Sequence, residues 1–191
     1  MSKIFIVSAP AGAGKTTLVN LLTQELPEVV RSVSCTTRAP RGSEKEGRDY
    51  HFLTRSQFEA KIAQDDFLEY AQVYGDYYGT SREFVDQQLA QGKSVVLVID
   101  TQGAMQLKEK IVSTSIFITI PSLDILRERL VKRKTETPEL IEKRLEWAKH
   151  EMEMASQYDY CIVNDDLETA YQALKQIILK KGEKHERTND K

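Results

Sequence analysis

Residues 3–16 read KIFIVSAPAGAGKT, a short apolar run that passes through small residues into a lysine and a threonine. The run at 3–8 has the near-continuous apolarity and β-branched side chains of a strand buried on both faces. Leucines then recur every four residues from 18 to 26, and the proline at 27 ends this helical pattern. A buried strand, a loop of small residues and a helix in this order predict the first β-α unit of a parallel sheet.

The loop at 9–16 approximates G-x-x-x-x-G-K-[ST], the pattern that cradles nucleotide phosphates, with Ala9 in place of the first glycine. Small residues let backbone N–H groups point at phosphate oxygens, and the N-terminus of the following helix adds positive potential. Lys15 is expected to neutralise the β and γ phosphates, and the Thr16 hydroxyl to help hold Mg²⁺. An ordinary strand–turn–helix junction is also rich in small residues, but the position between a buried strand and a periodic helix favours nucleotide binding. The predicted ATP-binding residues here are Ala9, Pro10, Ala11, Gly12, Ala13, Gly14, Lys15, Thr16 and Thr17.

The rest of the chain alternates strands with helices. Three further runs have the buried character of the first strand, at 94–99, 115–120 and 160–163. Helical patterns separate them, at 102–110, 122–132, 138–157 and 167–180. This alternation predicts an α/β fold in which helices flank both faces of a parallel sheet. We assign residues 1–33 and 92–180 to this phosphate-loop core.

The segment between the two parts of the core has a different pattern. It holds short alternating stretches at 49–52 and 67–73, a helix opening with the capping box Ser56-x-x-Glu59, and a capped helix at 81–92. We therefore expect a small α+β insert at 34–91.

Two polar segments complete the expected domain organisation. A charged stretch at 133–137 precedes Pro138, where a helix starts, and we expect a second, smaller insert there. Residues 181–191 have no apolar face and are expected to form a disordered tail.

Composition excludes several classes of protein. The 191 residues are 40% hydrophobic and 29% charged, which is globular, and 27 basic against 29 acidic residues disfavour a general nucleic-acid or membrane-surface binder. Cys35 and Cys161 lack metal-type spacing and lie in apolar stretches, so buried free thiols are expected. The chain shows no signal-peptide core and no span of roughly 20 apolar residues, so a soluble, cytoplasmic protein is expected.

A second motif lies in the insert. Residues 36–52 match T-[ST]-R-x-x-[KR]-x-x-[DE]-x-x-G-x-x-Y-x-[FY] at every position, and by this motif the chain resembles the guanylate kinase family. Five other segments agree with that family in order and spacing, so the resemblance covers residues 3 to 180. These segments lie at 67–71, 77–80, 99–103, 135–137 and 163–167.

The resemblance implies that the insert binds GMP. Two guanidinium groups and two tyrosine hydroxyls would hold the GMP phosphate, and a buried carboxylate would accept the N1–H and N2–H of guanine. Adenine would present a lone pair to that carboxylate and be repelled, while two hydroxyls would reach guanine O6. The GMP-binding residues implied are Arg38, Arg41, Tyr50 and Tyr78 at the phosphate, Glu69, Ser34 and Thr80 at the base, and Asp100 near metal or substrate, directly or through water. Taken singly, the arginines are more typical of a solvated turn, the tyrosines of packing in a small β-sheet, and Glu69 of a solvent-facing strand position. Their combination with the phosphate loop and the family spacing favours GMP binding.

The resemblance also implies a lid at about 133–143 and an adenine site. Arg133 and Arg144 would reach the transferring phosphoryl group, although arginines on helix surfaces show the same pattern. Asn164 and Asp165 would lie against the adenine of ATP. The catalytic set implied is Lys15, Arg38, Arg41, Arg133 and Arg144. Trp147 and the stripe Ile141, Leu145, Ala148 and Met152 are interpreted as core, and none of the three histidines has ligand context.

The function expected from these features is phosphoryl transfer from MgATP to GMP, and to dGMP, giving ADP and GDP by direct in-line attack. The substrates ATP and GMP are the expected partners and Mg²⁺ the expected cofactor, with no nucleic acid or membrane. Val98 stands where the family commonly has a second aspartate, and Ala9 and Ala11 stand where it usually has glycine and serine. Two alternatives are a catalytically inactive protein-binding domain and a related kinase with a ribose-phosphate acceptor.

Overall fold

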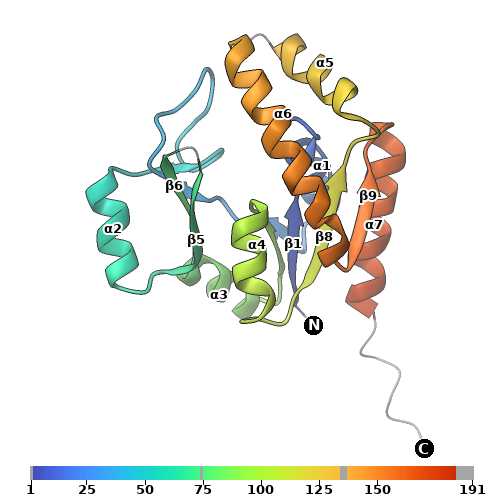
Figure 1. The fold of residues 1–191 in the computed structure, drawn as a ribbon. Coiled ribbons are helices and arrows are strands. Elements are labelled where there is room, and N and C mark those ends of the chain that lie inside the picture. Colours follow the sequence, from blue (N-terminus) through green and yellow to red (C-terminus); the bar gives the residue numbers. More distant parts are fainter. Residues whose placement is uncertain (1, 74, 134–136, 184–191) are drawn as a thin grey trace, which may run out of the picture.

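The computed structural model describes residues 2–73, 75–133 and 137–183, and its main element is a five-stranded parallel sheet (Figure 1). Its strands lie in the order β2-β7-β1-β8-β9 and every neighbouring pair is parallel. The strands are β1 (Ile4–Ser8), β2 (Val29–Arg31), β7 (Ser94–Val98), β8 (Thr114–Thr119) and β9 (Tyr160–Val163). Because β1 and β7 are parallel neighbours, the loops that follow them lie together at the carboxyl-terminal end of the sheet.

Helices cover both faces of this sheet, as predicted. Alternate residues of β1 enter two separate hydrophobic clusters, Phe5 and Val7 on one face and Ile6 on the other. The first cluster is completed by α1 (Lys15–Glu25), α5 (Leu123–Arg133), α6 (Pro138–Glu153) and α7 (Leu167–Glu183), and the second by α3 (Arg82–Ala90) and α4 (Thr101–Lys108). The α/β fold class is therefore confirmed.

A second, smaller sheet lies beside the first (Figure 1). It has the order β4-β3-β6-β5, formed by β3 (Cys35–Thr36), β4 (His51–Phe52), β5 (Phe67–Val73) and β6 (Asp76–Ser81), with α2 (Arg55–Ala63) packed against it. Phe58 of α2 is fully buried and stacks on Phe67 and Tyr77, with ring centroids 4.4 Å and 5.2 Å away. These elements fall within the predicted 34–91 insert, whose boundaries, like those of the lid, stay predictions.

Several local expectations are corrected by the structure. Helix α2 begins after Thr54. The Thr54 hydroxyl accepts the backbone N–H of Gln57, and the Thr54 backbone N–H donates to the side-chain oxygen of Gln57. The capping box is therefore formed by Thr54 and Gln57, and the prediction of Ser56 and Glu59 was wrong. Helix α6 ends at Glu153, and a 3₁₀ turn, η1 (Met154–Gln157), follows it. Helix α7 continues to Glu183, so the predicted tail starts with three helical residues, and 184–191 lie outside the described residues.

The two cysteines differ in environment. Cys35 is buried as expected, and burial raises its pKa to about 11. Cys161 is exposed, contrary to expectation, because β9 is an edge strand whose alternate residues face outward.

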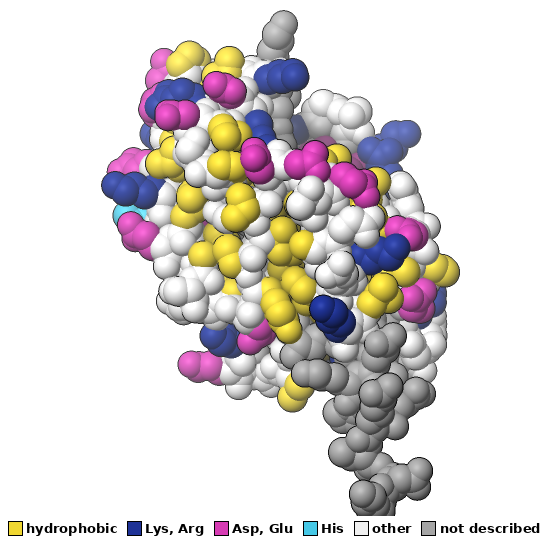
Figure 2. All heavy atoms as spheres, turned by 90° about the vertical axis from the view of Figure 1, so that its right-hand side faces the viewer, with side chains coloured by type: hydrophobic (Ala, Val, Ile, Leu, Met, Phe, Trp, Pro, Cys, Tyr) yellow, Lys and Arg dark blue, Asp and Glu magenta, His cyan; other side chains and the backbone are white. Residues whose placement is uncertain are grey.

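The outer surface carries charges of both signs. Figure 2 shows the face to the right in Figure 1, where basic and acidic side chains are interspersed around discontinuous hydrophobic areas. Exposed apolar side chains of β9 and α7 include Val163, Leu167 and Leu179. In the three described stretches, no helix is both long enough and apolar enough to cross a membrane.

Candidate active site

A cavity of about 320 Å³ lies where the phosphate loop, the small sheet and α6 come together. It brings together most of the residues predicted from sequence to bind phosphate or guanine, although they are separated by up to 135 positions in the chain. The predicted residues that line it are Ala9, Ala11, Lys15, Ser34, Arg38, Arg41, Tyr50, Glu69, Tyr78, Asp100 and Arg144. Val98, Trp147 and Glu151 also line it, and none of these three was predicted to bind a ligand.

The phosphate loop has the backbone that such a loop requires. Gly12 and Gly14 have φ of +99° and +91°, and a Cβ at Gly14 would lie 2.4 Å from the Asn164 amide nitrogen. In the described chain Asp65 is the one non-glycine residue with positive φ, so Ala9 and Ala11 take the places of glycine and serine without backbone strain. The departures from the family pattern are therefore compatible with the loop.

Asn164 has a second task in addition to its predicted one. Its side-chain amide is buried and donates to the Ala13 carbonyl at 2.7 Å, which ties the loop to the segment after β9. A hollow beside it is lined by Gly12, Gly14, Thr17, Arg129, Lys132, Asn164, Asp165 and Leu167. The predicted adenine contacts of Asn164 and Asp165 thus lie together at one hollow, while their role stays a prediction.

Lys15 points its ammonium group into the site. Its Nζ donates to the Ile99 carbonyl at 3.1 Å, immediately before Asp100 at the end of β7. Burial lowers the pKa of Lys15, and the nearby charges of Glu151 and Asp100 act in the opposite direction. The loop lysine and the acidic strand end therefore form one polar group at the base of the cavity.

Arg38 is held in a fixed orientation before any ligand binds. Its Nε donates to the Tyr78 hydroxyl at 3.2 Å, its Nη1 to the Ala39 carbonyl at 2.6 Å and its Nη2 to Glu44 at 2.9 Å. The guanidinium carbon lies 5.3 Å from the centre of the Tyr50 ring. Three of the four predicted phosphate ligands are thus packed together.

Glu44 was not assigned a role from sequence, although it is the acidic position of the matched motif. Besides Arg38, it accepts the backbone N–H of Arg41 at 2.8 Å. Partial burial opposes ionisation, but hydrogen bonds from Arg38 and from the Arg41 N–H lower the pKa of Glu44. Glu44 therefore orients the Arg38 guanidinium and fixes the backbone at Arg41.

Glu69 is a buried carboxylate on β5, with 5% of its surface exposed. Burial raises its pKa to about 7, hydrogen bonds from Thr80 work against that rise, and the charge of Asp100 adds to it. The Thr80 hydroxyl donates to Glu69 at 2.5 Å. Thr80 therefore orients the carboxylate, and its predicted contact with guanine O6 stays a prediction.

Gly103 leaves the room that Glu69 occupies. A Cβ at this position would lie 2.4 Å from Glu69 Oε2, and the Gly103 N–H donates to Asp100 at 2.7 Å. Gly103 belongs to the matched segment at 99–103, but nothing in the sequence indicates that it lies against Glu69.

Substitution of Gly103 by alanine is expected to lower kcat/KM for GMP about 100-fold, because the added methyl group displaces the carboxylate by about 1 Å. The KM for ATP is expected to stay unchanged, which serves as the internal control. Steady-state assays with each substrate varied in turn would measure both. An unaltered kcat/KM for GMP would show that the carboxylate does not need this position.

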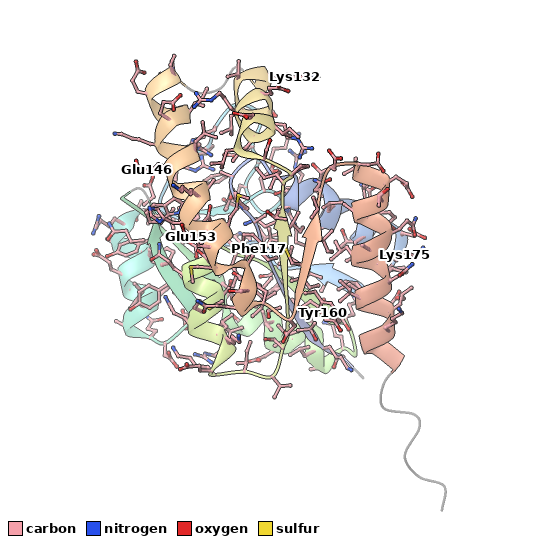
Figure 3. The ribbon with its side chains drawn as sticks, turned by 45° about the vertical axis from the view of Figure 1, so that its right-hand side comes forward. Phe117, Lys132, Glu146, Glu153, Tyr160 and Lys175 are labelled. Carbon is pink, nitrogen blue, oxygen red and sulfur yellow. The ribbon has the colours of Figure 1, made fainter. Side chains whose placement is uncertain are left out.

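The lid residues are placed in part. Arg144 lines the cavity from α6, whereas Arg133 is the last residue of α5 and its side chain, with residues 134–136, lies outside the described part. Helices α5 and α6 run side by side (Figure 3), joined by an ion pair between Arg127 and Glu142. Trp147 is 40% exposed and faces the cavity, so its assignment to the core was wrong.

The helical period explains the position of Trp147. Ile141, Leu145 and Ala148 form the buried stripe of α6, as predicted, and Met152 packs against it. Positions 144, 147 and 151 share the neighbouring face and all line the cavity.

The two residues predicted to hold a metal ion are placed differently. Asp100 lines the cavity, and its buried Oδ2 accepts no hydrogen bond from the described residues. Thr16 is exposed in the first turn of α1 and does not line the cavity, so its role at a metal ion stays a prediction. Within the described residues, no three His, Cys, Asp or Glu side chains form a metal-binding group. This donor set fits Mg²⁺ carried in with nucleotide phosphates and water, rather than an ion caged by the protein.

Comparisons with known proteins agree with this geometry. The family model described as guanylate kinase matches residues 1–181. A guanylate kinase from Protochlamydia amoebophila is 60% identical over 176 residues, covering 92% of this chain and 89% of that one. Another, from Koribacter versatilis, is 51% identical over 92% of this chain and 77% of its own length.

A solved structure gives the same result at the level of the fold. The crystal structure of guanylate kinase from Anaplasma phagocytophilum superposes with a TM-score of 0.81 at 34% identity, covering 96% of this chain and 88% of that one. Family model, relatives and fold coincide over nearly the whole chain, and the protein belongs to the guanylate kinase family.

Proposed function

We propose that the protein transfers the γ-phosphoryl group of MgATP to GMP, and also to dGMP, giving ADP and GDP in the cytoplasm. The observation that carries the proposal is one cavity that holds the phosphate-loop lysine, the Arg38 clamp and the buried Glu69. Lys15 indicates a triphosphate donor, Arg38 indicates an acceptor that carries a phosphate, and Glu69 indicates that the base of the acceptor is guanine.

The acceptor end works by orientation. Arg38, which Glu44 orients, would bind the GMP phosphate as a hydrogen-bond donor together with Arg41 and the hydroxyls of Tyr50 and Tyr78. Glu69, oriented by Thr80, would accept the two adjacent N–H groups of guanine. Both ends of GMP are then fixed, which sets the phosphate oxygen in line with ATP.

The transfer step needs no general base, because the attacking GMP oxygen is already anionic. A bond forms between that oxygen and the γ-phosphorus, the bond to the β,γ-bridging oxygen breaks, and ADP leaves with the electron pair. Lys15 neutralises charge on the transferring group, with Arg144 and Arg133 acting from the lid. Mg²⁺, when bound near Thr16 and Asp100, supplies further neutralisation of the phosphates.

The direct test is ADP formation from MgATP with GMP, dGMP, AMP, CMP and UMP in parallel. Strong dependence on GMP and dGMP, with weak AMP activity, is the expected result. Turnover on a ribose phosphate but not on GMP would support a different acceptor. ATP binding without turnover on any acceptor would make the chain a binding domain.

The binding of GMP is expected to depend on pH through Glu69. Its pKa of about 7 in the empty site means that it is largely protonated at pH 6, and only the carboxylate accepts both N–H groups of guanine. GMP affinity should therefore fall about tenfold between pH 8 and pH 6. Calorimetric titration of GMP across this range measures it.

The control for this pH dependence is guanosine, which lacks the phosphate that itself titrates near pH 6. Guanosine affinity should fall over the same pH range, because Glu69 is then the group whose proton matters. A guanosine affinity that stays constant between pH 8 and pH 6 would rule out a role for the Glu69 proton.

A further inference from the structure

A buried carboxyl group in the cavity has no assigned role. Glu151 lies on α6 with 7% of its surface exposed, and it lines the cavity beside Lys15, Asp100 and Arg144. Among the described residues, none donates a hydrogen bond to its side chain. Burial raises its pKa to about 7, the charge of Lys15 works against that rise, and the charge of Asp100 adds to it. Burial of this carboxylate is unfavourable, and the residue lines a ligand cavity. Both observations indicate that its partner arrives with the ligand.

The surroundings of Glu151 define that partner as a cation. Asp100 contributes a buried Oδ2 with no hydrogen-bond partner, and the charges of Asp100 and Glu151 influence each other. Against the effect of burial, the charge of Lys15 acts to lower the pKa of Glu151, and the charges of Glu151 and Asp100 act to raise the pKa of Lys15, so two carboxylates interact with one ammonium group at the base of the cavity. Glu151 on α6 and Asp100 after β7 are therefore two carboxylates from different elements that line one cavity.

Two carboxylates beside a triphosphate have opposite effects on two forms of the nucleotide. Metal-free ATP brings only negative charge and is repelled by Asp100 and Glu151. Magnesium-bound ATP brings a dication that keeps several of its waters, and each water can donate hydrogen bonds to carboxylate oxygens. The two carboxylates thus weaken the binding of metal-free ATP and strengthen the binding of magnesium-bound ATP. The difference between the two affinities is the specificity of the site.

We propose that Glu151, together with Asp100, makes the site select metal-bound ATP over metal-free ATP by accepting hydrogen bonds from the water shell of the metal. This inference rests on the proposed function, because it assumes that ATP enters beside Lys15. Glu151 acts as a positioning and selecting residue here, and it takes no part in bond making.

The test compares the affinity of the β,γ-imido analogue of ATP with Mg²⁺ and with EDTA, by calorimetry at pH 8 in the absence of GMP. Mg²⁺ should strengthen binding to the wild type, and the Glu151→Gln variant should lose about tenfold of that strengthening or more. Its affinity for the metal-free analogue should be equal to that of the wild type or tighter. Asp100→Asn, which retains an N-cap side chain for α4, should show a loss in the same direction.

Glu146→Gln is the matched control, because Glu146 lies on the same helix (Figure 3) but is exposed. It should keep the wild-type ratio of the two affinities. Glu151→Asp tests the charge itself: a variant that keeps the carboxylate should retain most of the metal preference even if its stability is reduced. Circular dichroism on each variant shows whether it folds.

The possible failures are distinguishable. A wild type that binds the analogue under neither condition would contradict the proposed function itself. A wild type that binds it, combined with a Glu151→Gln variant of unchanged affinity ratio, would overturn only the role of Glu151. Equal weakening of both forms in that variant would also overturn it, because it would show general damage to the phosphate site.

Discussion

Replacement of Lys15 by alanine is expected to lower kcat for GMP phosphorylation about 1,000-fold. Lys15 carries the one ammonium group that the structure places at the base of the cavity among the described lysines, and burial there strengthens its interaction with phosphate oxygens. The methyl group of alanine leaves the charge that develops on the transferring group without this partner. ADP release coupled to a spectroscopic assay measures the loss.

The fold is expected to survive this substitution. Among the described residues, the Lys15 ammonium group donates one hydrogen bond, to the Ile99 carbonyl, and forms no ion pair within 4 Å with Asp100 or Glu151. Its removal therefore breaks few contacts of the fold. Lys149→Ala, which removes an exposed lysine from α6, is the matched control and should retain full kcat. A Lys15→Ala variant with activity within tenfold of the wild type would contradict direct stabilisation of the transferred group by Lys15.

The second large effect is expected at Glu69. Glu69→Gln should lower kcat/KM for GMP about 10,000-fold. A buried site that can no longer pair the hydrogen-bonding groups of its substrate loses kcat/KM by about this factor. A glutamine amide has one acceptor oxygen, which the Thr80 hydroxyl already uses, and its NH₂ group faces the donors of guanine. Preference for GMP over AMP should collapse in the same variant.

The measurement is kcat/KM for GMP, AMP and IMP, which has N1–H but lacks the amino group at C2. The wild type should use IMP poorly, since one of the two guanine donors is missing. Glu83→Gln on α3 gives the control, because Glu83 is exposed and its side chain accepts from Gln87. If Glu69→Gln kept the wild-type preference for GMP over AMP, base recognition would have to come from another group.

The central strands could be predicted from sequence because each is a continuous apolar run buried on both faces. The runs predicted at 3–8, 94–99, 115–120 and 160–163 correspond to β1, β7, β8 and β9. The strands β2, β3 and β6 could not be predicted in the same way. β2 and β3 are three and two residues long, and β6 reads DYYGTS, so their pairing depends on the neighbouring strand rather than on their own apolarity.

Side-chain exposure was harder to predict than the elements. Trp147 and Cys161 are apolar and lie in apolar or periodic stretches, yet both are exposed. In α6 the face toward the cavity is one helical step from the face toward the core, and β9 lies at the edge of its sheet. Neither the direction of a helix face nor the order of strands is contained in local periodicity.

The amino-acid sequence alone determined the family, the phosphate loop and the residues of the predicted clamp. These features lie in contiguous motifs, in which spacing along the backbone decides which groups can meet. Tertiary structure alone decided that Gly103 makes room for Glu69 and that Glu151 lies in one cavity with Asp100 and Lys15. Burial, steric fit and electrostatic interaction depend on distance through space, and the fold brings together residues that are far apart in the sequence.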